Sequence, residues 1–186
     1  MRLRRFCLAI AAAAVPLTAA AAPPTWTVDK AGSRLGFSTT VSGGALNGAF
    51  RSWDAVIRFD PNDLAHSDVA VTIDIASATT GNGDADASLP DQDWLWTSHF
   101  PRATFVAKSF RATGPGRYEA AGVLTLRGVA KPLTLPFTLA ITGATAKMNA
   151  RVALNRLAFG VGQGEWKATD TVPATVTVNV ALSAHH

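Results

Sequence analysis

Strict alternation of apolar and polar residues runs through most of the chain. In residues 133–141 five apolar side chains alternate with Pro, Thr and Ala, and in residues 68–75 Val and Ile alternate with Asp, Ala and Thr. A period of two indicates β-strands that bury one face. The same pattern recurs, less regularly, in residues 35–41, 53–59, 105–111, 118–127, 146–154 and 172–180. The chain is therefore predicted to form about eight strands.

The connections between these segments are short and rich in turn-forming residues. Gly43 and Gly44, residues 60–63 (DPND) and residues 113–116 (TGPG) interrupt the alternation, and residues 128–131 are predicted to turn the chain between its two most apolar strands. Residues 79–101 differ because they have no period of two. They are predicted to form a short helical insertion around residues 83–97.

The predicted fold is all-β. Eight antiparallel strands are enough to close a barrel around one slender ligand, although a two-sheet sandwich has the same patterning. If the barrel closes, the inward side chains form a continuous apolar lumen. The predicted lumen residues are Phe37, Ile57, Phe59, Val71, Ile73, Phe105, Leu126, Leu135, Phe137, Met148, Val152, Val176 and Val178.

Residues 1–22 have the features of a secretory signal peptide. Arg2, Arg4 and Arg5 precede an apolar run of about a dozen residues, and cleavage is predicted after Ala20, Ala21 or Ala22. The apolar run is shorter than the ~20 residues needed to span a bilayer. We therefore expect residues 23–186 to form one exported barrel domain.

Composition narrows the possible functions. Cys7 is the only cysteine and lies in the predicted leader, so the exported domain is expected to contain neither disulfides nor cysteine metal sites. The whole chain has 17 Lys and Arg; removing the three leader arginines leaves 14, against 13 Asp and Glu. This near-neutral balance gives no indication of nucleic-acid binding.

Motifs for catalysis or metal binding are scarce. The chain has no G-x-S-x-G, H-E-x-x-H or phosphate-loop motif. Residues 82–93 imitate a calcium loop, but Ala87 stands where the sharp turn needs glycine and Asp93 replaces the usual glutamate. His66 lies in a polar turn and is read as a solvated residue. No metal, cofactor or catalytic residue is predicted.

Aromatic residues cluster around the segments that are not strands. Trp94, Trp96, His99 and Trp166 are predicted to lie at the barrel mouth, where amphipathic rings suit a ligand head group or a membrane interface. The alternative is an enzyme acting on a lipid or quinone head group, with His99, Trp94 and Trp166 as its only supports.

The sequence resembles the YceI-like family over essentially all of residues 23–186. The matching segments include residues 26–29 (WTVD), 57–60 (IRFD), 93–95 (DWL), 100–105 (FPRATF), 122–132 (GVLTLRGVAKP) and 159–166 (FGVGQGEW). Trp96 departs from the pattern, because an acidic residue often follows the Trp-Leu pair.

The resemblance implies a periplasmic, eight-stranded, lipocalin-like barrel without catalytic residues. It implies a polyprenyl lipid or an isoprenoid quinone as the ligand. The expected function is to sequester that chain in the lumen and to shuttle it to or from a membrane or a membrane redox protein.

Overall fold

A computed structural model describes residues 22–186, so the predicted signal peptide, apart from Ala22, lies outside the described residues. The strands are β1 (Thr25–Val41), β2 (Gly44–Phe50), β3 (Trp53–Arg58), β4 (Asp68–Asp74), β5 (Ala78–Thr79), β6 (Arg102–Gly114), β7 (Arg117–Leu126), β8 (Val129–Thr142), β9 (Thr145–Asn155) and β10 (Thr175–His185). The helices are α1 (Gly83–Ser88) and the 3-10 helices η1 (Ile75–Ser77), η2 (Arg156–Phe159) and η3 (Gly164–Lys167).

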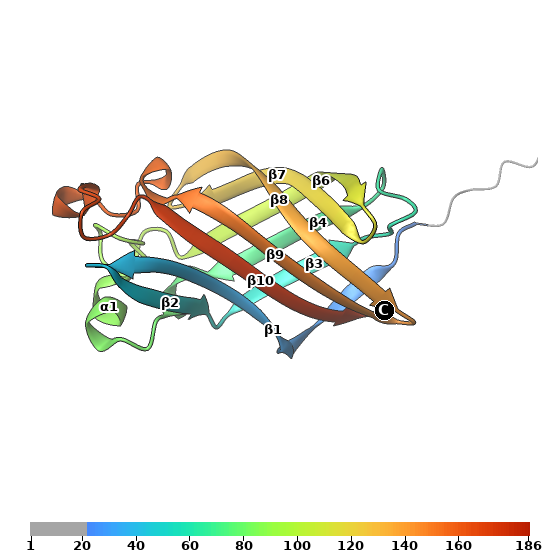
Figure 1. Cartoon of the computed structure of the whole chain (residues 1–186), viewed down its shortest axis with the longest axis horizontal. Helices are drawn as coiled ribbons and strands as arrows, with labels where there is room; N and C mark the ends of the chain where they lie inside the picture. Colours follow the sequence, from blue (N-terminus) through green and yellow to red (C-terminus); the bar gives the residue numbers. More distant parts are fainter. Residues whose placement is uncertain (1–21) are drawn as a thin grey trace, which may run out of the picture.

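Eight of the strands close into a barrel, which confirms the predicted fold class (Figure 1). Their order is β10-β9-β8-β7-β6-β4-β3-β1, and β1 pairs with β10 to complete the ring. Every pairing is antiparallel. The two short strands β2 and β5 extend the sheet beyond β1.

Strand β1 bends in the middle and therefore has different neighbouring strands at the two ends of the barrel. Its pairing with β10 shifts register between Asp29 and Arg34, where extra residues form a bulge. Before the bulge β1 pairs with β3, and after it with β2. The bulge therefore lets one strand change neighbours as it crosses the wall.

The sequence pattern missed three features of this topology. Strand β2 has no clear alternation because Gly48 interrupts it; the Phe37 ring lies over this glycine, and a Cβ there would come within 2.2 Å of the ring. The predicted turn at 128–131 is instead a two-residue turn at Arg127 and Gly128, both with positive φ. The expected helical insertion is helical only over α1, and turns follow it.

Two buried clusters fill the ends of the barrel. At one end, Trp26, Phe59, Ala146 and Ala184 pack together, and Leu64 from the turn after β3 packs against them. At the other end, buried residues such as Leu95, Phe159 and Val161 pack against the barrel wall. Phe110 and Phe137 pack against both clusters, so the core continues along the lumen between the two ends.

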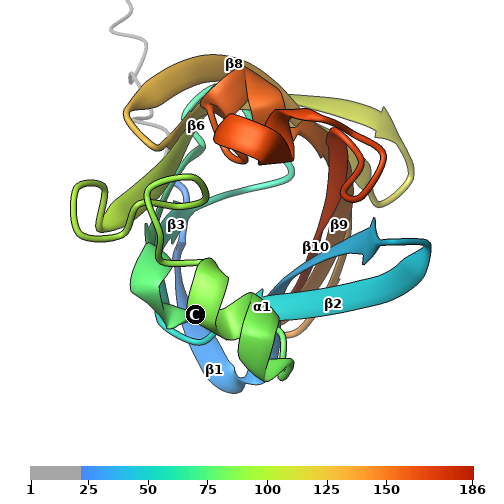
Figure 2. The ribbon, with the colours of Figure 1, turned by 90° about the vertical axis from the view of Figure 1, so that its left-hand side faces the viewer.

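Two segments cover this second end and are called the cap, defined as residues 83–100 and 156–173. Figure 2 looks onto that end and shows α1 over one side of it and the coil that carries η2 and η3 over the opposite side. No helix within residues 22–186 is both long and apolar enough to cross a bilayer.

Candidate functional site

The candidate site is a cavity in the barrel lumen. Its lining is hydrophobic throughout and comes from strands all round the ring: Trp26, Leu35, Trp53, Ala55, Ile57, Phe59, Val69, Val71, Phe105, Phe110, Ala120, Leu135, Phe137, Leu139, Ala146, Met148, Val180, Leu182 and Ala184. The free volume is about 120 Å³. Ordinary ligand pockets measure roughly 300–1,000 Å³, so a bulky ligand would have to spread the lining side chains.

The structure brings seven of the predicted lumen residues to this cavity: Ile57, Phe59, Val71, Phe105, Leu135, Phe137 and Met148. The remaining six, Phe37, Ile73, Leu126, Val152, Val176 and Val178, do not line it. Ile73 and Leu126 pack against the buried cluster near the cap. That any of these residues binds a ligand stays a prediction.

Sequence reasoning missed several lining residues, most notably Trp26 and Trp53. Trp26 precedes the first recognised strand, so its face could not be assigned from alternation. In the structure it is buried, and its Nε1–H donates to the Phe59 carbonyl oxygen at 2.9 Å. The WTVD segment was the only signal that could have located it.

Phe59 is the centre of an aromatic group at the end of the lumen far from the cap. Its ring centroid lies 5.3 Å from Phe110, 5.6 Å from Tyr118 and 5.9 Å from Phe137, all with edge-to-face geometry. Such pairs contribute about 0.5–1.5 kcal/mol each beyond area burial. The group closes that end with well-packed, apolar side chains.

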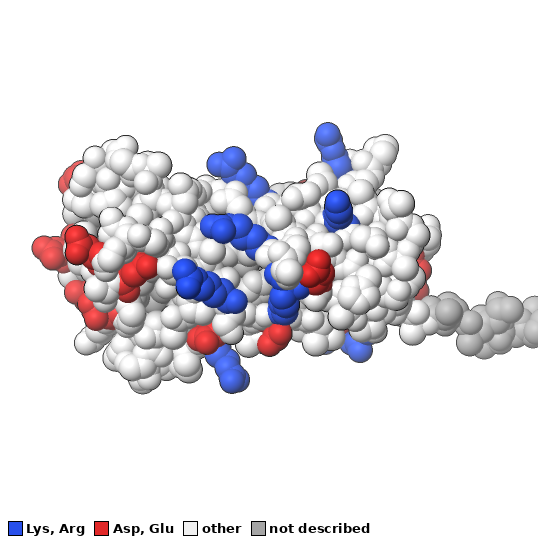
Figure 3. Space-filling model, turned by 90° about the horizontal axis from the view of Figure 1, so that it is seen from below, with Lys and Arg blue, Asp and Glu red and all other residues white. Residues whose placement is uncertain are grey.

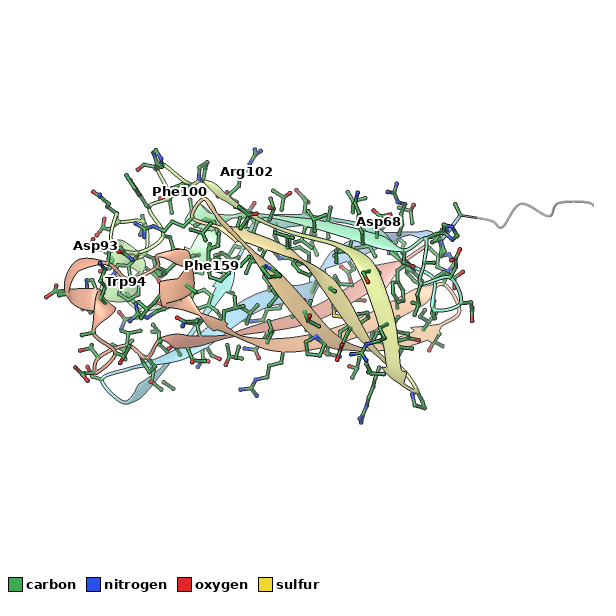
Figure 4. All side chains as sticks on the ribbon, turned by 90° about the horizontal axis from the view of Figure 1, so that it is seen from above. Asp68, Asp93, Trp94, Phe100, Arg102 and Phe159 are labelled. Carbon is green, nitrogen blue, oxygen red and sulfur yellow. The ribbon has the colours of Figure 1, made fainter. Side chains whose placement is uncertain are left out.

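The two cap segments are joined through Asp93. Its backbone carbonyl accepts hydrogen bonds from the backbone N–H groups of Gly162 (2.8 Å) and Gln163 (2.7 Å). Beside this junction, Trp94 and Trp166 pack with ring centroids 5.2 Å apart. Asp93, Trp94 and Phe159 can be seen together at the cap end in Figure 4. The cap is therefore one connected unit.

Arg156 holds the second cap segment together, although it is a charged residue that is only 3 % exposed. Its guanidinium donates to the carbonyl oxygens of Pro173 (3.0 Å), Val161 (3.0 Å), Trp166 (2.7 Å), Ala168 (3.4 Å) and Val172 (2.8 Å). Burial lowers the pKa of Arg156. Gly162 makes room for it, because a Cβ there would meet Nη1 at 1.8 Å.

Asp86 organises the first cap segment. Its carboxylate accepts from the Thr80 hydroxyl and backbone N–H (both 2.6 Å), from the Thr79 hydroxyl (2.8 Å) and from the Gly81 backbone N–H (3.2 Å). These bonds, those from Thr80 above all, lower the pKa of Asp86 from its ordinary 3.8 to about 2. In the calcium-like loop, Asn82 caps the N-terminus of α1, and no group of acidic, His or Cys residues within residues 22–186 is arranged to hold a metal ion.

We expect the cap around α1 to loosen in acid. A carboxyl group whose pKa is lowered on folding stabilises the fold fully above its unfolded pKa of ~3.9, and this contribution is lost as pH falls toward the folded value. Protection of the α1 amides against hydrogen exchange, relative to the intrinsic exchange rate at each pH, should therefore fall between about pH 4 and pH 2.

The matched pair Asp86→Asn and Asp84→Asn tests this prediction. Asp86→Asn should make α1 exchange faster at neutral pH and remove the acid transition. The Asp84 carboxylate has no hydrogen bond within residues 22–186, so Asp84→Asn should behave as wild type. Equal behaviour of the two variants would contradict the assignment.

The residues predicted at the mouth form two separate pairs. Trp94 packs on Trp166, whereas Trp96 stacks on the exposed His99 at 4.5 Å between ring centroids. Arg127 lies over Trp96 at 5.6 Å and donates to the Gln92 carbonyl oxygen. Trp94 Nε1 and Arg127 Nε are buried without a hydrogen-bond partner among the described residues. His99 is therefore not grouped with the other two residues on which the enzyme alternative rests.

Comparison with known families gives a clear result. Residues 26–184 match the model of the YceI-like domain. A UPF0312 protein of Pseudomonas syringae pv. tomato is 28% identical over 151 residues, covering 78% of this chain and 75% of that protein. Protein YceI of Escherichia coli O157:H7 is 38% identical over 90 residues, which are 48% of this chain and 47% of that protein.

Solved structures agree with this match. The crystal structure of BcnA from Burkholderia cenocepacia superimposes with a TM-score of 0.82 at 33% identity, covering 84% of this chain and 99% of that one. A polyisoprenoid binding domain from Saccharophagus degradans has a TM-score of 0.68 and covers 86% of this chain and 97% of that one, but at 13% identity it shows the fold alone. The chain described here belongs to the YceI-like domain family.

Proposed function

We propose that this protein binds and carries a linear isoprenoid chain, such as a polyprenyl lipid or an isoprenoid quinone, in the barrel lumen. The observation that carries the proposal is the cavity, which is lined by hydrophobic side chains alone. Such a surface offers nothing to a polar ligand and much to a hydrocarbon chain. The S. degradans neighbour is described as binding polyisoprenoids, which supports the same ligand class.

The free energy of transferring the chain into the lumen suits a protein that takes up and releases its ligand better than one that retains it permanently. Each isoprene unit removed from water is worth up to ~4 kcal/mol at ~0.8 kcal/mol per methylene. A ligand that starts in a bilayer gains little of this, because its chain is already surrounded by hydrocarbon. Transfer from membrane to lumen is then close to neutral, and the chain can be both taken up and released.

Export to the periplasm is part of the proposal and rests on the leader-like residues 1–22. In that compartment an isoprenoid must cross water between membranes or proteins, and an enclosed lumen would shield it. The partner that gives or receives the chain would be a membrane or a membrane redox protein.

Extraction of the native protein tests the ligand class. Protein purified from the periplasm without detergent should yield a prenyl lipid or quinone on organic extraction and mass spectrometry. If no such lipid is recovered and the purified protein also fails to bind added polyprenol, the proposed function is wrong.

Replacing His99 separates a carrier from an enzyme. His99 is exposed and does not line the cavity, so His99→Ala should leave the amount of bound isoprenoid within twofold of wild type. The measurement is bound lipid per protein after gel filtration. Chemical conversion of the lipid head group by wild type, lost in His99→Ala, would favour the enzyme alternative instead.

A further inference from the structure

The barrel wall is incomplete between β8 and β9. Their pairing runs only from Phe137 and Ala150 to Thr142 and Thr145. Nearer the cap, residues 129–136 of β8 pair with β7 alone, and residues 151–155 of β9 pair with β10 alone. We call this unpaired stretch the seam. In Figure 2, β8 arches over the top of the cap end while β9 and β10 lie at the right.

Two prolines explain where the seam begins. Pairing of β8 with β9 stops at Phe137, immediately beside Pro136, and Pro132 lies further along the same stretch. Proline has no N–H to donate to a ladder. Strand β7 pairs through both prolines, so the missing donors fall on the β9-facing edge. The same prolines disfavour the addition of an extended peptide at this edge.

The flanks of the seam are apolar and only half-buried. Leu133 and Leu135 of β8 and Val152 and Leu154 of β9 alternate with exposed neighbours such as Thr134 and Ala153, yet none of the four is fully buried. A hydrocarbon chain passing between the strands would meet these side chains. Because no backbone pairing joins β8 to β9 in the seam, the wall can also widen here. The lumen has little free volume, so entry of a ligand requires such widening.

An outer hollow of about 650 Å³ opens on the outside of the wall where the ladder ends. Pro136, Phe137, Ala150 and Arg151 line one side of it. Phe137 and Val180 also line the lumen cavity. The outer hollow and the lumen thus meet across one layer of the wall, next to the seam.

Both ends of the barrel are closed by buried side chains. The buried cluster around Trp26 and Phe59 fills one end. At the other end, Leu95, Phe159 and Val161 pack under the cap. A ligand using either end would have to displace a packed core. Passage through the seam breaks no ladder bonds and displaces only half-buried side chains, among them Leu133, Leu135 and Leu154.

The outer hollow carries three arginines, Arg34, Arg117 and Arg151, all exposed. None of them forms an ion pair with another residue of 22–186. Figure 3 shows most Lys and Arg over the middle of the molecule, with a few Asp and Glu among them, and a group of Asp and Glu without Lys or Arg at the cap end. An anionic bilayer surface would therefore attract the flank of the barrel and repel the cap.

We propose that the barrel docks by its flank, with the outer hollow against the phosphate groups of an anionic bilayer, and that the isoprenoid chain moves sideways through the seam. This inference rests on the proposed function and adds its route and its membrane partner. It differs from the expected use of the mouth tryptophans, which lie at the acidic end.

The test measures how fast a fluorescent polyprenol moves from vesicles to the protein. Continuing the β8–β9 register beyond Phe137 places Thr134 opposite Ala153, and both are exposed. In a Cys7→Ser background, Thr134→Cys with Ala153→Cys is joined by a short bis-maleimide. The linked protein should take up the polyprenol at least tenfold more slowly than the same protein capped with N-ethylmaleimide.

The matched control is Ala140→Cys with Lys147→Cys. These residues are already paired on the same two strands, are exposed and lie outside both the outer hollow and the lumen. Linking them should leave the uptake rate unchanged. Uptake that is equally fast with and without the link at 134 and 153 overturns the sideways route.

The docking surface is tested by charge removal. The variant Arg34→Gln, Arg117→Gln, Arg151→Gln should lose most flotation with vesicles containing phosphatidylglycerol, and its uptake from them should slow about tenfold. Uptake from pure phosphatidylcholine vesicles should not change. The control Arg51→Gln, Arg102→Gln, Lys108→Gln removes the same charge elsewhere and should lose less; equal loss in both variants overturns docking through the outer hollow.

Equilibrium binding distinguishes failure of the proposed function from failure of the proposed route. Polyprenol delivered from ethanol should saturate linked and unlinked proteins alike. If it binds neither, the proposed function fails and the route fails with it. If it binds both and the seam link does not slow uptake, only the route is wrong.

Discussion

Replacing Arg156 by methionine is expected to lower the free energy of unfolding by about 3 kcal/mol. Hydrogen bonds to charged groups contribute ~1.5–3 kcal/mol each, but removing a buried charge recovers part of the loss. Five carbonyl groups from 161–173 would lose their donor. At ~2–4 °C per kcal/mol for a domain of this size, the thermal midpoint should fall by about 10 °C.

Two further variants make this result specific to Arg156. Arg156→Lys keeps the charge but cannot reach five carbonyls, so it should destabilise nearly as much. Arg102 is exposed at the start of β6, and Arg102→Met should change stability by less than ~0.5 kcal/mol. A midpoint for Arg156→Met within 2 °C of wild type would contradict its role in holding the cap.

An acidic residue in the lumen is expected to abolish isoprenoid binding. Val71 lines the cavity, where it lies opposite Ala55 on β3 and Phe105 on β6. In Val71→Asp the new carboxylate would have no partner there, and burying it beside a hydrocarbon chain costs several kcal/mol. We expect at least a hundredfold loss of polyprenol affinity and a destabilisation of about 3 kcal/mol.

The neighbouring variant Thr72→Asp is the control. Thr72 is on the outer face of β4 and exposed, so the same charge should change neither affinity nor thermal midpoint appreciably. Ligand titration and thermal unfolding of both variants are the measurements. If Thr72→Asp were the harmful one, the assigned face of β4 would be inverted.

Strand β4 illustrates how much the sequence could predict. Val69, Val71 and Ile73 alternate with Ala70, Thr72 and Asp74. Of the two residues predicted to line the lumen, Val71 lines the cavity, whereas Ile73 packs against the cluster near the cap; Val69, which was not predicted, lines the cavity as well. Burial on one face forces a period of two, so the face of such a strand is visible without any knowledge of its neighbours. Fold class and much of the lumen follow from this one constraint.

The turn between β7 and β8 was predicted in the wrong place for a local reason. A two-residue hairpin of this type needs positive φ at both central positions, which Asn, Asp or Gly usually provide. Here the first position is Arg127, whose side chain reaches the cap. Contacts distant in sequence can stabilise this conformation, and composition alone does not reveal them.

The role of Arg156 and the seam could not be predicted for a different reason. A charged residue at a strand end ordinarily remains in solvent, and its burial here depends on carbonyl groups that only the folded 161–173 segment brings together. Pro132 and Pro136 were visible as outward residues of an alternating strand. That they end a ladder depends on which strand lies beside them.

The number of isoprenoid chains bound per barrel measures directly whether the lumen holds this ligand. The purified protein is incubated with excess polyprenol, separated by gel filtration, and the bound lipid is quantified by mass spectrometry against protein. We expect one chain per barrel for wild type and for Thr72→Asp, and none for folded Val71→Asp. A wild-type protein that retains no polyprenol, or a Val71→Asp variant that retains as much as wild type, would contradict it.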